Sequence, residues 1–119
     1  MTVQIFGFLN DQETRKAQRF FAERRIEVHL VNLDERPASR GELRRFKERF
    51  GASALINREG SRFRALGLNV AGDSPERLLD RATTEPRLLR TPLVRSGNQL
   101  SIGHAPDQWR TWLENQTPV

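Results

Sequence analysis

Two carboxylates stand at the start of the first predicted helix, a place where α/β domains often carry out small-molecule chemistry. Asp11 and Glu13 follow an apolar segment at residues 2–8 and open a helical pattern that runs to about residue 24. The free N–H groups and the dipole of a helix N-terminus favour an anion at this position. Here the protein's own carboxylates fill it, so the sequence indicates the fold more clearly than the activity.

The chain contains no cysteine, and this absence excludes several kinds of chemistry. Disulfides, thiolate metal sites and a redox cycle carried by this chain alone are ruled out. The two histidines, His29 and His104, are far apart in the sequence, whereas zinc needs several ligands at set spacing, so no metal site is predicted. The glycines fit neither the phosphate loop nor the dinucleotide-binding pattern, and no cofactor is predicted.

Arginine supplies nearly all of the positive charge in this basic chain, which has a formal net charge of +5 and a pI near 11.1. Acidic residues are interleaved with the basic ones, as at residues 42–49, and such mixing is typical of a solvated helix face. We favour that interpretation, place an acidic protein partner second, and place nucleic acid last. No apolar run reaches the roughly 20 residues of a membrane span, so a cytoplasmic location without a membrane partner is expected.

The order of the predicted elements is β-α-β, a helical insertion, then β-β-α, which is the thioredoxin architecture. In a chain of 119 residues a single domain covering 1–119 is expected. Asn10 is predicted to cap the first helix, with Glu13 at the capping-box spacing, and Ser39 with Glu42 repeats this pattern at the second helix. The predicted strands cover residues 2–8, 26–32, 92–95 and 99–102, and the main predicted helices begin near residues 11, 39, 74 and 106.

The chain resembles the arsenate reductase (ArsC)/Spx family of thioredoxin-fold proteins. The resemblance runs from Val3 to about Leu113 and rests on the shared order and spacing of short segments, the best of which is the hairpin at residues 88–103. The others are Arg15-Lys16-Ala17 in the first helix and the segments at residues 32–43 and 63–68. The resemblance implies a thioredoxin-like fold with a mixed four-stranded sheet flanked by helices. In its length and its Arg-Lys-Ala helix start, the chain is nearer to Spx-type proteins than to the long arsenate reductases.

The resemblance also places the family's redox residues on this sequence. The nucleophilic cysteine of the family lies in the first turn of the first helix, where the helix dipole lowers the thiol pKa. That position aligns with Asp11, and the second cysteine of the Spx-type Cys-x-x-Cys pair aligns with Thr14. The resemblance therefore implies a retained scaffold whose thiol chemistry is gone.

The oxyanion-binding arginines of the family are replaced as well. They fall at or beside Asn57, on Thr91 and at His104. The alignment near Asn57 can slip by one residue onto Arg58, and Arg90 is a neighbour that can partly substitute at the second position. Three arginine forks hold a tetrahedral oxyanion, and asparagine, threonine and histidine do not. Arsenate reduction is therefore predicted to be absent.

A cis peptide bond is predicted between Thr91 and Pro92, because in the resembling family this proline is cis and shapes the active-site floor. The candidate residues of the vestigial or ligand-binding site share a place in or beside the family's motifs. They are Asn10, Asp11, Thr14, Arg15, Asn57, Arg58, Arg90, Thr91, Pro92 and His104.

Two classes of function follow from this resemblance. The leading hypothesis is a catalytically inactive thioredoxin-fold module that acts by binding. Spx-type relatives bind the C-terminal domain of the RNA polymerase α subunit, so the specific hypothesis is a transcription-associated adaptor. Its candidate partner-binding residues are Arg44, Arg45 and Arg49, which could contact an acidic surface. The alternative is an enzyme that uses an external thiol such as glutathione, bound beside Pro92. The third possibility is a paralogue that has no defined function and is diverging without selection for one.

Overall fold

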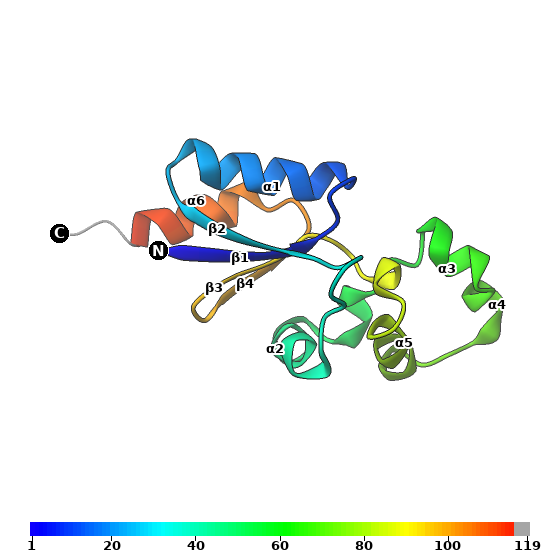
Figure 1. Ribbon diagram of the computed structural model, residues 1–119. Coiled ribbons are helices and arrows are strands. Elements are labelled where there is room, and N and C mark those ends of the chain that lie inside the picture. Colours follow the sequence, from blue (N-terminus) through cyan, green and yellow to red (C-terminus); the bar gives the residue numbers. More distant parts are fainter. Residues whose placement is uncertain (116–119) are drawn as a thin grey trace. The chain divides into compact units, whose positions relative to one another are not determined.

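The computed structural model describes residues 1–115, in which four strands form one mixed sheet (Figure 1). The strands are β1 (Thr2–Gly7), β2 (Glu27–Asn32), β3 (Leu93–Ser96) and β4 (Gln99–Ile102), and their order across the sheet is β2-β1-β3-β4. β1 and β2 are parallel, as the predicted β-α-β unit requires, and the two other pairings are antiparallel. The predicted thioredoxin-like sheet is confirmed.

The helices also follow the predicted order. They are α1 (Gln12–Glu23), α2 (Arg40–Phe50), α3 (Ser61–Ala65), α4 (Leu68–Ala71), α5 (Pro75–Ala82) and α6 (Pro106–Asn115), with the short turns η1 (Ala52–Leu55) and η2 (Pro86–Leu88). The single turn α4 has no counterpart in the prediction, because four residues are too few for a helical period to be visible. No helix among residues 1–115 is long and apolar enough to cross a membrane.

The chain divides into two compact units. The first comprises Met1–Asn32 and Thr91–Val119 and holds the whole sheet with α1 and α6. The second, Leu33–Arg90, is the helical insertion between β2 and β3. The single domain expected from chain length stays a prediction.

One face of the sheet carries the core of the first unit. α1 and α6 lie on the same side of the sheet in Figure 1, and the buried cluster there joins all three elements. The ring centroid of Trp109 lies 5.2 Å from that of Phe20 and 5.3 Å from that of Phe21. The Nε1–H of Trp109 donates to the hydroxyl of Ser101 at 2.8 Å, which satisfies the polar atom of a fully buried indole. Both tryptophans of α6, Trp109 and Trp112, are buried.

The predicted capping box of α2 is present in the second unit. The hydroxyl of Ser39 accepts from the amide of Glu42 at 3.1 Å, and the Glu42 carboxylate accepts from the amide of Ser39 at 3.0 Å. Leu43 and Phe46 are buried on the inner face of this helix. Phe50, the last residue of α2, is 36 % exposed.

Candidate functional site

Asp11 caps the N-terminus of α1. Its backbone is extended, and its side chain accepts from the backbone amide of Thr14. The Asp11 amide donates to the carbonyl of Phe8 at 3.1 Å, which closes a turn through Asn10 before the helix begins. The predicted cap at Asn10 is therefore wrong by one residue. The turn places the next side chain, that of Asp11, within reach of the free helix amides.

The predicted partner of that cap, Glu13, also has a different role. Its carboxylate pairs with Lys16 at 3.2 Å within the first turn of α1. The other carboxylate oxygen lies 3.7 Å from Nδ1 of His104, an exposed residue just before α6. The capping-box spacing is present in the sequence, but the reciprocal bond requires the cap to lie at Asn10.

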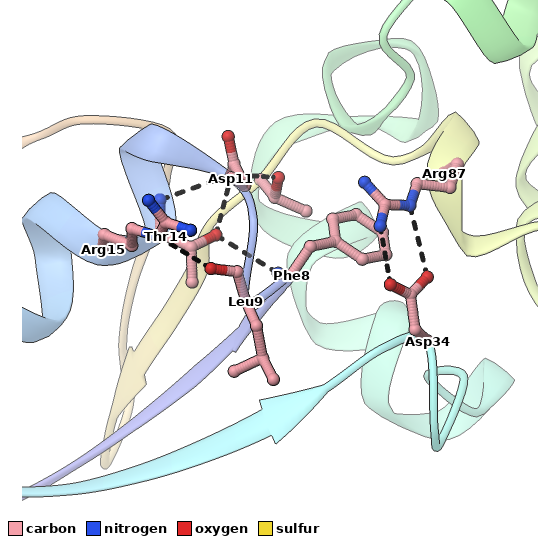
Figure 2. A network of polar contacts seen from close by, with 8 residues as sticks. Phe8, Leu9, Asp11, Thr14, Arg15, Asp34 and Arg87 are labelled. Atoms are coloured by element: carbon pink, nitrogen blue, oxygen red, sulfur yellow. Dashed lines mark hydrogen bonds and ion pairs between the residues drawn. The ribbon is translucent and has the colours of Figure 1, made fainter.

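Three donors converge on one oxygen of the Asp11 carboxylate. Oδ2 accepts from the backbone amide of Thr14 at 3.3 Å and from the Thr14 hydroxyl at 2.7 Å. It also accepts from the hydroxyl of Thr91 at 2.7 Å. Figure 2 shows Asp11 and Thr14 in this arrangement. All three residues belong to the first unit, so Asp11 ties the start of α1 to the segment that enters β3.

Thr14 is the buried centre of this network. Its side chain is fully buried, and its hydroxyl oxygen also accepts from the amide of Phe8 at 3.4 Å. A Cβ atom added to Gly7 would lie 2.3 Å from that oxygen, so only glycine permits the close approach of β1 to α1. Gly7 was not among the predicted site residues, although a glycine at a strand end is a signal for such an approach.

Arg15 supports the turn and does not pair with Asp11. Its Nε–H donates to the carbonyl of Leu9 at 2.8 Å, as Figure 2 shows. No arginine among residues 1–115 forms an ion pair with Asp11. The Asp11 carboxylate is held by hydroxyl and amide donors alone, which is a capping arrangement and not a salt bridge.

Pro92 and His104 complete the candidate residues in the first unit. The Thr91–Pro92 bond is cis, which confirms the prediction, and Pro92 is buried. The exposed His104 ring packs edge-on against Trp109, with 5.7 Å between the ring centroids.

The remaining candidates, Asn57, Arg58 and Arg90, lie in the second unit around an isolated β-bridge. The amide of Asn57 donates to the carbonyl of Leu88, and the amide of Arg90 donates to the carbonyl of Leu55, each at 2.8 Å. The bridge thus brings two segments together that are distant in the sequence. Arg58 and Arg90 are exposed, and the Arg58 guanidinium lies 5.9 Å from the ring centroid of Phe63.

A bidentate ion pair in the second unit was not predicted. The guanidinium of Arg87 donates to both carboxylate oxygens of Asp34, with Nε–Oδ1 at 3.2 Å and Nη2–Oδ2 at 2.6 Å (Figure 2). The two residues are 53 positions apart, near the two ends of this unit. Nothing in the local sequence pairs them, because only the tertiary structure brings these segments together.

The arginines proposed for partner binding lie on α2. Arg44, Arg45 and Arg49 are all exposed. At the start of the same helix, two hydrogen bonds from Arg36 lower the pKa of the Glu42 carboxyl to about 2 and raise the pKa of Arg36. The start of α2 therefore carries an ionised carboxylate. The three exposed arginines form no ion pair with any residue in 1–115.

The chemistry available at the Asp11 end of α1 is narrow. A carboxylate cannot form or resolve the sulfur adducts that a thiolate forms. Within the part of the chain that the structure describes, no three histidine, aspartate or glutamate side chains are grouped so as to hold a metal ion. The arrangement is that of a capped helix N-terminus, with a carboxylate held by Thr14 and Thr91.

The sequence model of the ArsC family matches residues 6–112, nearly the whole chain. This chain belongs to the ArsC family. It is 28 % identical over 119 residues to the global transcriptional regulator Spx 2 of Oceanobacillus iheyensis. That match covers 98 % of this chain and 87 % of the relative.

Solved structures support the fold at lower sequence identity. The structure titled YffB (PA3664) protein superposes with a TM-score of 0.83 at 20 % identity and covers 92 % of this chain and 96 % of its own. An arsenate reductase from Vibrio cholerae gives a TM-score of 0.77 at 22 % identity, with coverages of 91 % and 94 %. These matches establish a thioredoxin-like fold of the ArsC/Spx type for this member of the family, which has no cysteine.

Proposed function

We propose that this ArsC-family protein is catalytically inactive and acts by binding a protein partner in the cytoplasm. The concrete partner that we propose is the C-terminal domain of the RNA polymerase α subunit, and the role is that of a transcription-associated adaptor. The observation that carries the proposal is Asp11 itself. At the position that the resemblance assigns to the nucleophile, the chain has a helix cap bound by Thr14 and Thr91.

Relatives support the binding role. Several relatives that match most of this chain carry the name global transcriptional regulator Spx, including those of Lactococcus lactis and Streptococcus pyogenes. A regulator needs a folded surface and no turnover, so loss of the thiol leaves such a role intact. The exposed Arg44, Arg45 and Arg49 supply positive charge that would favour and steer an acidic surface.

Affinity capture from the native cell extract tests this proposal. The wild-type chain is expected to retain the RNA polymerase α subunit at low salt, identified by mass spectrometry. Reversal of Arg44, Arg45 and Arg49 to glutamate is expected to abolish retention. The matched control reverses Arg19, Arg64 and Arg77, which are also exposed arginines and lie on other elements. Failure of the wild-type chain to retain the α subunit would contradict the named partner.

The alternative enzyme, which uses an external thiol, makes a different prediction. Titration with glutathione is expected to give no heat, and no thiol-dependent turnover of disulfide or arsenate substrates is expected. Heat on titration together with such turnover would favour the alternative over the binding role. Both results are read on the same wild-type protein.

A further inference from the structure

A groove of about 270 Å³ lies between α2 and α5 in the second unit. These two helices are labelled in Figure 1. Leu43 from α2 and Leu79 from α5 line it and are both buried, so the floor of the groove is apolar. Its walls are charged, with basic residues from α2 and acidic residues from α5.

Two ion pairs join α2 to α5 at this groove. Arg40 pairs with Asp80, and Lys47 pairs with Glu76 at 2.8 Å between Nζ and Oε2. All four side chains are at least two-fifths exposed, so the pairs lie at the rim of the groove and not beneath it. Arg40 and Lys47 are about two helical turns apart, and the groove between them remains open.

Arg44 lies between these two pairs on the same face of α2. It follows Arg40 by one helical turn and precedes Lys47 by nearly one, the spacings at which helical side chains are neighbours. Arg44 lines the groove and is exposed, yet its guanidinium makes no hydrogen bond or ion pair with any residue in 1–115. The Arg44 guanidinium therefore has free donors and lines the groove together with the buried Leu43 and Leu79. Its two basic neighbours on α2 are already paired with acidic residues.

We infer that this groove binds an acidic side chain of a partner protein, with Arg44 as the bidentate donor to its carboxylate and Leu43 and Leu79 as the contact for its aliphatic part. The charge of the walls selects the occupant. Three cations face two carboxylates, so a single added carboxylate completes the balance. A nucleic acid would bring a row of phosphates against Glu76 and Asp80 and would be repelled. The inference rests on the proposed binding function and assigns a surface to it.

Fluorescence anisotropy with a defined acidic probe tests the groove. The probe is a fluorescein-labelled peptide of repeated Glu-Ala-Ala-Leu units, the control peptide replaces glutamate with glutamine, and oligothymidylate serves as the nucleic-acid arm. Wild-type protein is expected to bind the acidic peptide more tightly than either of the other two. Arg44→Gln is expected to weaken binding about tenfold, because it removes the central donor. Arg77→Gln, an exposed arginine of α5 outside the groove, is expected to change it by less than about twofold.

A second variant tests the role of the wall charges in the opposite direction. Asp80→Asn frees Arg40 from its ion pair, so it is expected to tighten binding of the acidic peptide about threefold. Wild-type affinity in Arg44→Gln, equal binding of the glutamine peptide, or tighter binding of oligothymidylate would overturn the inference. If the α-subunit domain binds the wild-type chain and Arg44→Gln does not weaken that binding, the groove is not the binding surface, but the proposed function is still supported. If the domain does not bind but the peptide binds through Arg44, the named partner is wrong and the groove is still supported as an acidic-peptide site.

Discussion

At the scale of single residues, Asp11 places a negative charge at the N-terminus of α1, where the helix dipole favours it. A thiolate at a helix N-terminus is stabilised by the dipole and by free amides, and a carboxylate is stabilised in the same way. Here the carboxylate additionally takes hydroxyl donors from Thr14 and Thr91. Asp11, which the resemblance aligns with the family's nucleophile, is therefore a structural helix cap.

Removal of this cap is expected to destabilise the protein. The Asp11→Ala variant is expected to lose about 1–2 kcal/mol of unfolding free energy, the usual effect of losing an N-cap. Equilibrium urea unfolding measures the change. Asp107→Ala is the matched control, because that aspartate is 96 % exposed and its ion pair with Arg110 lies at the surface. A loss below about 0.5 kcal/mol is expected there, and equal losses in both variants would contradict the capping role.

Any side chain at position 7 is expected to destabilise the protein. In the Gly7→Ala variant the new Cβ would collide with the buried Thr14 side chain, and a cost of about 1–3 kcal/mol in unfolding free energy is expected. Gly41→Ala provides the opposite control, because the nearest atom to its added Cβ is 3.9 Å away and the residue lies in α2. That variant is expected to gain up to about 1 kcal/mol in the same urea experiment. Destabilisation of both variants by the same amount would refute the specific contact.

At the scale of elements, the sequence predicted most of what local physics controls. The strand at residues 2–8, the capping box of α2 and the helix start near residue 74 were predictable because neighbouring residues produce them. The cap of α1 was displaced by one residue because two candidate side chains adjoin and the turn decides between them. The contact of Asp11 with Thr91 spans 80 positions and has no local signature.

The start of α2 is expected to give the protein a measurable pH dependence. The pKa of Glu42 in the folded protein is about 2, lowered first by the hydrogen bonds from Arg36, and it lies below the usual value of 4.5. The stabilisation is therefore fully present above about pH 4.5 and is lost as pH falls toward about 2.

Urea unfolding of wild type and Glu42→Gln at several pH values measures this effect. The stability difference between them is expected to be largest at neutral pH and to shrink steadily below pH 4.5. Glu48→Gln, on the same helix and exposed, is the control and is expected to show a small difference at every pH. A difference for Glu42→Gln that does not vary with pH would show that the Arg36 contact is not formed in solution.

At the scale of the whole molecule, the fold and the family were predictable, and the site was predictable only in part. The fold could be predicted from the order of the elements and from the hairpin formed by β3 and β4. The candidate residues divide between the two units, with Asp11, Thr14 and Thr91 joined in one network and Asn57 and Arg90 around a β-bridge. The identity of the partner could not be predicted from the sequence, because a surface of arginines indicates the charge of a ligand but not which ligand it is.

Restoring a thiol is expected to leave the molecule without arsenate reductase activity. In Asp11→Cys the helix N-terminus is expected to lower the thiol pKa below about 8.5, which the pH dependence of iodoacetamide alkylation measures. Turnover of arsenate with glutathione is nevertheless expected to be absent. Asn57, Thr91 and His104 stand where the resemblance places the oxyanion-binding arginines. Sustained turnover would contradict the account of the lost site.

Calorimetric titration of the wild-type chain with the purified C-terminal domain of the RNA polymerase α subunit tests the binding role most directly. Saturable binding at low salt is expected, and it should be lost when Arg44, Arg45 and Arg49 are reversed to glutamate and retained when Arg19, Arg64 and Arg77 are reversed. The absence of any heat of binding to the wild-type chain, or equal binding by both reversed variants, would contradict it.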